Sequence, residues 1–479
     1  MINKISPSSS KSSQSANGIV GRIAPRLRTT ISQWFGRANS SLPASALIFL
    51  SLTAFALLRS YPNLTPQPSS INAHDQAEYI HSGVDLLHGK IPPLAYHPLV
   101  SIVYAAAYLP FRNSPIGFIL TEWLVRMVLY SGLWASVWLV AHEFRRFVPP
   151  WTLAAIWAVA PLPDRLLSNS SQMLFVILSA LALWQMMRFA SRQRTRNLLA
   201  ASLALGFAML ARNEALWILL LSAPAVLIVD RLPPRETTPP QGAGHLSTGI
   251  PRLVAFTVPF VFTILIFQAT YFCTTGLFDT GLSIRTYDAL EAGQGLTYPE
   301  RYPGNPFISG ISDSRRIYGS GQDNGQSVLR AVLRNPSAMI QRIGRNILGI
   351  PTSLVQGYGG YLGAMLIVFA ICGLVTLARL GQWKLLSILV AFSFFELLYL
   401  PFFWLTSYWL FLFPIVFALV AVGIKWVIYD SGPLFWAAAL ALAAALLVTS
   451  ALIPSWRWGY IALASLTFIR FPAISEIIN

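Results

Sequence analysis

Charged side chains are scarce in this chain, and acidic ones are the scarcest. Only 11% of the 479 residues are charged, whereas 55% are hydrophobic. This balance excludes a soluble globular protein and indicates a multi-span membrane protein. The 34 basic residues outnumber the 18 acidic ones. Because they lie largely between apolar runs, their excess reflects membrane topology and predicts no nucleic-acid partner.

Cysteine is nearly absent, and so are the marks of several other protein classes. Cys273 and Cys372 fall at the outer end of one predicted span and inside the next, so no disulfide framework is expected. Residues 1–43 contain no acid and no apolar core beside a small-residue cleavage site. We therefore expect a disordered basic cytoplasmic tail there, not a cleaved signal peptide. No internal repeat of the kind that marks many transporters is present.

Long apolar runs predict an all-α polytopic membrane protein, because about 20 apolar residues cross a bilayer as a helix. We expect about eleven spans by this criterion, at 43–58, 116–141, 151–162, 173–189, 198–210, 215–229, 253–272, 361–377, 385–403, 408–427 and 434–453. They form one transmembrane domain over 44–453, followed by a C-terminal tail, 454–479. The apolar range 99–111 is too short to cross and is expected to be a surface helix.

Basic residues between the spans predict the orientation of the chain. Arg145 and Arg146 follow one span, and a second cluster over 192–196 follows another, which places both in the cytoplasm. The N-terminus is then cytoplasmic, in a bacterial-type plasma membrane, and the loops 59–98 and 273–359 are external. Within the second loop, 327–348 is expected to form an interfacial pair of amphipathic helices, broken at Pro336 and bearing basic residues that include Arg342.

The stretch 71–98 is the acid-rich part of the predicted external loop 59–98. The first acid of the chain, Asp75, lies near its start. With Asn72 as N-cap, Asp75 lies in the first turn of a predicted amphipathic helix that ends near Gly89. One face of this helix is polar and is formed by His74, Glu78, His81, Asp85 and His88. The opposite face is apolar and is formed by Ala77, Ile80, Val84 and Leu87. The polar stripe is either a solvated face or a set of metal ligands.

Three short segments here resemble the GT-C class of polyprenyl-phosphate-sugar-dependent glycosyltransferases. They are Asp75-Gln76-Ala77-Glu78-Tyr79, Leu86-Leu87-His88-Gly89 and Tyr96-His97-Pro98-Leu99. The resemblance implies a GT-C-like fold and an inverting transfer from a lipid-linked sugar donor of the outer leaflet. It also implies a divalent metal ion as candidate cofactor, with Asp75 as candidate ligand.

Two departures from the GT-C pattern affect the predicted site. Many members carry two adjacent acids where this chain has Asp75 and Gln76, so Glu78, one turn further on, is the candidate for the second carboxylate. Relatives often have an Arg-Tyr pair before a late Pro-containing span, where this chain has Ser407 and Tyr408.

Catalysis by this class requires a base for the acceptor hydroxyl and cations for the departing phosphate. Arg212 and arginines of the loop 285–345 fit the role of the cations. The predicted catalytic residues are Asp75, as base or metal ligand, and Glu78. The predicted substrate-binding residues are Tyr79, His97, Arg126, Asp164 and Arg212. For three of them a structural role competes, namely ion pairs of Arg126 with Glu122, of Asp164 with Arg165 and of Arg212 with Glu214.

The sequence thus predicts a membrane glycosyltransferase acting on the outer side of the membrane, with a lipid-linked sugar donor and a lipid, glycan or protein acceptor. A transporter or lipid flippase would also use charges at membrane depth, such as Arg212 and Glu396. A non-catalytic GT-C-like membrane protein is a further alternative, because Gln76 and Ser407 depart from the pattern. The sequence leaves the sugar and the acceptor open.

Overall fold

The structure is a computed structural model. It describes residues 50–51, 54, 75–93, 97–145, 147, 169–232, 249–278, 282–302, 306–357, 361–402 and 411–430. Within these ranges the chain forms α-helices and short 3-10 helices and no strand. The all-α prediction is therefore confirmed for the described part of the chain. The predicted tails, 1–43 and 454–479, and the loop that contains Asp164 lie outside the described residues.

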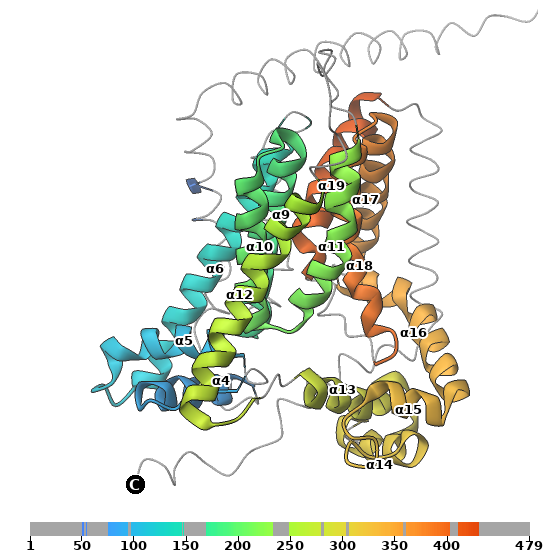
Figure 1. Ribbon diagram of the computed structural model, residues 1–479. Coiled ribbons are helices and arrows are strands. Elements are labelled where there is room, and N and C mark those ends of the chain that lie inside the picture. Colours follow the sequence, from blue (N-terminus) through green and yellow to red (C-terminus); the bar gives the residue numbers. More distant parts are fainter. Residues whose placement is uncertain are drawn as a thin grey trace, which may run out of the picture.

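A bundle of apolar helices makes up most of the molecule (Figure 1). Its members are α6 (Gly117–Glu143), α9 (Ser170–Arg192), α10 (Thr195–Ala211), α11 (Glu214–Arg231), α12 (Gly249–Thr275), α17 (Tyr361–Arg379), α18 (Trp383–Phe394) and α19 (Phe413–Asp430). In the bundle α10 packs against α9 and α12, α9 against α6, α11 against α18, and α17 against α19. We call the end at which α9 and α11 begin the α4 end, and the end at which α9 finishes the Arg192 end.

Three of the described helices, α6, α9 and α12, are long and apolar enough to cross a membrane, and α10 and parts of α17 and α19 are shorter apolar helices. This agrees with a helical membrane protein. The predicted number of spans is not established, because 151–162, 434–453 and most of 43–58 lie outside the described residues. The predicted span 385–403 differs from the structure, since α18 ends at Phe394 and the 3-10 helix η4 (Phe395–Tyr399) replaces it.

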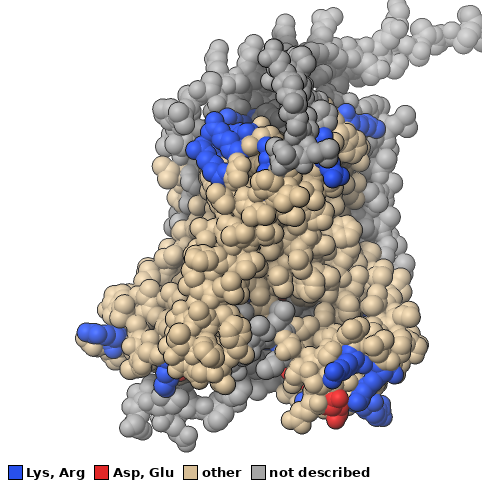
Figure 2. Space-filling view, viewed as in Figure 1, with Lys and Arg blue, Asp and Glu red and all other residues tan. Residues whose placement is uncertain are grey.

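The surface of the bundle has the charge distribution that a bilayer requires. In Figure 2, Lys and Arg gather at both ends of the visible face, and a broad band without charge separates them. Helix α12 exposes large apolar side chains along its length, among them Val254, Val258, Phe262 and Ile266. A hydrocarbon core accepts such side chains and excludes charges, so this band fits the membrane-embedded part of the molecule.

At the α4 end, helices α4 (Asp75–Leu87) and α5 (Pro98–Tyr108) pack against each other, and the short 3-10 helix η2 (Leu109–Phe111) follows α5. Gly83 lets them approach closely, because a Cβ there would lie 2.9 Å from the Ala105 nitrogen. The predicted helix is confirmed, and its polar stripe, Glu78, His81, Asp85 and His88, is exposed. The predicted apolar face is confirmed at Ile80, which is buried, but not at Leu87, which is 40% exposed, and the buried Tyr79 was not part of that predicted face.

The predicted external loop 273–359 is largely folded into helices. They are α13 (Leu282–Thr297), η3 (Pro299–Arg301), α14 (Pro306–Tyr318), α15 (Val328–Arg334) and α16 (Pro336–Gly357), and Figure 1 shows the first four beside the α4 end of the bundle. The predicted break at Pro336 is confirmed. Side chains of α15 and α16, including Ala331 and Met339, pack against Tyr287 and Tyr318 of α13 and α14, so part of the predicted membrane face is the core of this unit.

The prediction for Arg342 as an exposed basic residue of an interfacial helix is wrong. Its side chain is fully buried and donates to the Leu290 carbonyl at 2.9 Å and to Gln294 Oε1 at 2.6 Å. The guanidinium also stacks over the Tyr318 ring, 4.7 Å from its centroid. Helical periodicity predicted the wrong exposed face because the side of α16 that carries Arg342 packs on α13. The hydrophobic side chains that α16 does expose include Ile340 and Leu348.

Orientation across the membrane remains a prediction, and two conservative cysteine substitutions test it. Ser312 is exposed on α14, and Ser191 is exposed at the Arg192 end. With the exposed native Cys273 replaced by Ala, a membrane-impermeant thiol reagent should label Ser312→Cys in intact cells and Ser191→Cys only after lysis. The opposite pattern would place the α4 end in the cytoplasm and contradict the predicted orientation.

Candidate functional site

The turn between α10 and α11 places Arg212 at the α4 end of the bundle. Its Nη2 and Nε donate to Glu214 Oε1 at 2.6 and 3.0 Å, and its Nη1 lies 3.5 Å from Ser171 Oγ on α9. Tyr399 of η4 donates to the same Glu214 oxygen at 2.5 Å. The competing ion-pair prediction for Arg212 is therefore confirmed. The guanidinium is nevertheless held at a junction of three elements, with the Phe411 ring beneath it at 5.3 Å.

His97 occupies an unusual backbone position directly before α5. Its φ of 55° and ψ of 67° are left-handed, a conformation that L-residues seldom adopt, and its side chain is 2% exposed. Pro98 fills the first helical position, where no backbone donor is needed. The strained backbone and the proline together aim the imidazole inward, toward α13.

The His97 imidazole accepts a hydrogen bond at Nε2 from Arg285 of α13. Burial lowers the pKa of His97 well below its usual value, and the positive charges of Arg285 and Arg212 lower it further, so the ring is neutral. Because arginine can only donate, the proton of the neutral ring is on Nδ1. That N–H is buried and has no acceptor among the described residues, so its capacity to donate a hydrogen bond is unused there.

Two cations and one neutral donor thus meet at the α4 end. Arg212 comes from the α10–α11 turn and Arg285 from the first turn of α13, and the charges of both act on His97. Among the residues that the structure describes, no carboxylate forms an ion pair with Arg285. This arrangement suits an anion that carries several acceptor oxygens, such as a phosphate group.

A second polar chain connects this site to α6. The Tyr79 ring lies 6.0 Å from His97 and 6.4 Å from Tyr104 between centroids. The Tyr104 hydroxyl donates to Glu122, which accepts from Arg126 Nε at 2.7 Å. The same hydroxyl lies 2.8 Å from Ser170 Oγ, next to Ser171. The competing ion-pair prediction for Arg126 is confirmed, and the predicted residues Tyr79, His97, Arg126 and Arg212 lie along one continuous network.

The two predicted catalytic carboxylates are less well defined. Asp75 is the first residue of α4, but its side chain lies outside the described part of the structure. Glu78 is exposed on the polar stripe of α4. In the described part of the chain, no three His, Cys, Asp or Glu residues lie close enough to share a metal ion. A metal ion held partly by Asp75 therefore stays a prediction, and the solvated interpretation of the stripe agrees with its exposure.

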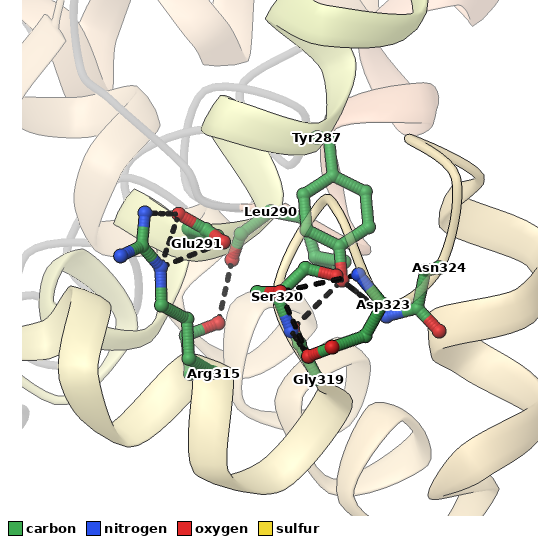
Figure 3. A network of polar contacts seen from close by, with 9 residues as sticks. Tyr287, Leu290, Glu291, Arg315, Gly319, Ser320, Asp323 and Asn324 are labelled. Carbon is green, nitrogen blue, oxygen red and sulfur yellow. Dashed lines mark hydrogen bonds and ion pairs between the residues drawn. The ribbon is translucent and has the colours of Figure 1, made fainter.

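Helix α13, which carries Arg285, is joined to α14 and to the turn after α14 by a polar network (Figure 3). Arg315 of α14 forms paired hydrogen bonds with Glu291 of α13 at 2.9 and 3.0 Å. Tyr287 of α13 donates to the Gly319 carbonyl at 2.8 Å and accepts from Asn324 at 2.6 Å. The unit is joined to the bundle through Asn346 of α16, which donates to the Leu400 carbonyl at 2.7 Å.

The sequence predicted that arginines of the loop 285–345 stabilise the departing phosphate, but it did not single out Arg285, and it missed Ser171 and Tyr399. Nothing in the neighbours of Arg285 along the chain marks it among these arginines. Ser171 and Tyr399 are ordinary residues at helix ends. Their partners lie tens of residues away or more, so only the packing of the bundle brings them to the site.

Arg126 and Glu122 offer a test of how much the buried ion pair contributes to stability. Both are buried, with side-chain exposures of 8% and 0%, so Arg126→Met leaves a carboxylate without its cation and should cost about 3–5 kcal/mol of stability. Adding Glu122→Gln removes the stranded charge and should restore most of that loss. Thermal melting in detergent measures the stability of the single and the double variant. A single Arg126→Met variant as stable as the wild type would contradict the buried pair.

Comparison with known proteins identifies no family. A scan against protein-family models gave no match, and a search of curated proteins gave none either.

Proposed function

We propose that this chain is an integral membrane glycosyltransferase that uses a polyprenyl-phosphate-linked sugar. One observation carries the proposal. The charges of Arg212 and Arg285, which come from separate parts of the chain, act together on the buried neutral His97, whose Nδ1–H has no acceptor among the described residues. This donor-rich site lies at the α4 end of an apolar bundle, where the phosphate of a membrane lipid would be located. The resemblance of residues 75–99 to the GT-C class is the reason for proposing that this lipid phosphate carries a sugar.

The proposed reaction is a single displacement. Asp75 takes the proton of an acceptor hydroxyl, and that oxygen attacks the anomeric carbon while the bond from this carbon to the phosphate oxygen breaks. The electron pair leaves with the phosphate, so polyprenyl phosphate departs with one more negative charge than it carried in the donor. Arg212, Arg285 and the His97 N–H would stabilise that charge. One displacement inverts the anomeric configuration.

Lipid binding and sugar transfer test the proposal separately. Protein in nanodiscs should bind polyprenyl phosphate, and Arg285→Ala should weaken this binding about 10- to 100-fold, as for a lost hydrogen bond to a charged group. Arg316→Ala is the matched control, because Arg316 is exposed on the neighbouring α14 and its ion pair among the described residues is with Asp313 at 3.0 Å.

Three outcomes discriminate between the functions. Binding together with transfer to an added acceptor supports a glycosyltransferase. Binding without transfer, combined with lipid movement between leaflets, would favour the flippase alternative. No binding of polyprenyl phosphate by the wild-type protein would refute the phosphate assignment of Arg212, Arg285 and His97.

A further inference from the structure

Glu396 is a buried carboxyl group that the proposed reaction does not use. It lies in η4, the short 3-10 helix that replaces α18 after Phe394. Its side chain is 2% exposed, and neither carboxyl oxygen has a hydrogen-bond partner in the described structure. Buried polar side chains are nearly always paired, so an acid with two unused oxygens is exceptional.

The position of Glu396 connects it to the phosphate-binding residues. In a 3-10 helix residues three apart share a face, so Glu396 lies on the same side of η4 as Tyr399, whose hydroxyl donates to Glu214. Its neighbour Phe395 packs on Phe411 with centroids 6.2 Å apart, the ring over which Arg212 lies. The charges of Glu214 and Arg212 both act on Glu396.

No described residue satisfies the carboxyl group of Glu396. Arg212 is already paired with Glu214 at 2.6 Å, and the ring of the neighbouring Phe395 has no hydrogen to donate to oxygen. A carboxyl group withdrawn from water without a partner destabilises the folded protein. A binding site can tolerate this loss of stability when a bound ligand donates hydrogen bonds to the carboxyl group. The acid then destabilises only the ligand-free protein.

We infer that Glu396 binds hydroxyl groups of the sugar carried by the lipid donor. This rests on the proposed function, because it assumes that the phosphate of the same donor lies at Arg212. The two carboxyl oxygens can accept one hydrogen bond each from neighbouring hydroxyl groups of a pyranose or furanose ring. Glu396 is therefore a specificity residue for the sugar and has no part in breaking the bond to phosphate.

The experiment compares lipids with and without the sugar. Dissociation constants are measured for undecaprenyl phosphate and for undecaprenyl-phosphate glucose, mannose, galactose and arabinose, with wild type, Glu396→Gln and Glu396→Leu. At least one sugar should strengthen wild-type binding over the bare phosphate lipid. Glu396→Leu should remove that gain, about 10- to 100-fold for the loss of two hydrogen bonds, and leave the bare lipid unaffected. Glu396→Gln keeps one acceptor oxygen and should keep part of the gain.

The melting temperature of the ligand-free protein distinguishes a ligand-binding role of Glu396 from a structural role, because the two roles predict opposite changes in Glu396→Leu. Removing an unsatisfied buried acid should leave the melting temperature of Glu396→Leu unchanged or raise it, whereas loss of a structural contact lowers it. Glu143→Gln, at the Arg192 end and bonded to Trp184 at 3.2 Å, is the control that should not alter lipid binding.

Each result supports or overturns one statement. If the wild-type protein binds neither kind of lipid, the proposed function fails. If it binds the bare phosphate lipid but gains nothing from any of the four sugars, or if Glu396→Leu retains the gain, the inference about Glu396 fails and the proposed function stands. A Glu396→Leu protein that melts markedly lower also overturns the inference, because the acid then supports the fold.

Discussion

Asp75→Asn should lower sugar transfer by about 10²- to 10⁴-fold, the usual contribution of a positioned general base. Asparagine has nearly the shape of aspartate and is accepted at the start of a helix, so α4 should still form. What is lost is the ability to take a proton or to bind a metal ion. The measurement is transfer from a polyprenyl-phosphate sugar by membranes that contain matched amounts of each protein.

Two other acids of α4 provide the controls for Asp75. Asp85 is exposed and pairs with Lys90 at 3.1 Å, so Asp85→Asn should leave transfer unchanged. Glu78→Gln should be mild if Glu78 only supports Asp75, and as severe as Asp75→Asn if Glu78 replaces the second acid that is absent at Gln76. Turnover close to the wild type with Asp75→Asn would refute the catalytic assignment and leave Asp75 as a helix-terminal acid.

Arg212→Ala should combine two large losses, one in stability and one in donor binding. The side chains of Arg212 and Glu214 are only 12% and 16% exposed, so the variant leaves a largely buried carboxylate without its cation, at a cost of about 3–5 kcal/mol. Arg212→Lys keeps the charge but loses the forked geometry, and should weaken donor binding with a smaller loss of stability.

The double variant Arg212→Leu with Glu214→Gln separates these two effects. It removes both charges, and the glutamine oxygen can still accept from the Tyr399 hydroxyl, so thermal stability should return toward that of the wild type. Donor binding should not return, because no cation has been restored near the phosphate. Wild-type donor affinity in the double variant would assign Arg212 a structural role only.

The sequence was most informative where local chemistry decides the structure. Apolar runs located α6, α9, α10, α11, α12 and α17 to within a few residues, and Gly89 and Pro336 marked helix boundaries correctly. These features depend on neighbours within one or two turns. The polar stripe of α4 was also correct, because a surface helix has one wet face whatever it packs against.

Prediction failed where a distant partner decides the structure. Arg342 looked like a surface arginine, but the Leu290 carbonyl, Gln294 and the Tyr318 ring enclose it. Stretches 282–302 and 306–327 are polar enough to resemble a loop, and their helices form because α13 and α14 pack on each other through contacts such as Arg315 with Glu291. Periodicity within one segment contains no information about such partners.

The wide spacing of the site residues along the chain has a consequence for biosynthesis. His97 and Arg285 are 188 residues apart, and Glu214 and Tyr399 are 185 apart. Chains emerge from the ribosome N-terminal end first, so α5, α6 and the α10–α11 turn are made long before α13 and η4. Until then His97 lacks Arg285, and Glu214 lacks the Tyr399 hydroxyl. A nascent chain released before residue 282 would hold half of a charged site in the membrane, which makes such fragments natural targets for quality-control proteases.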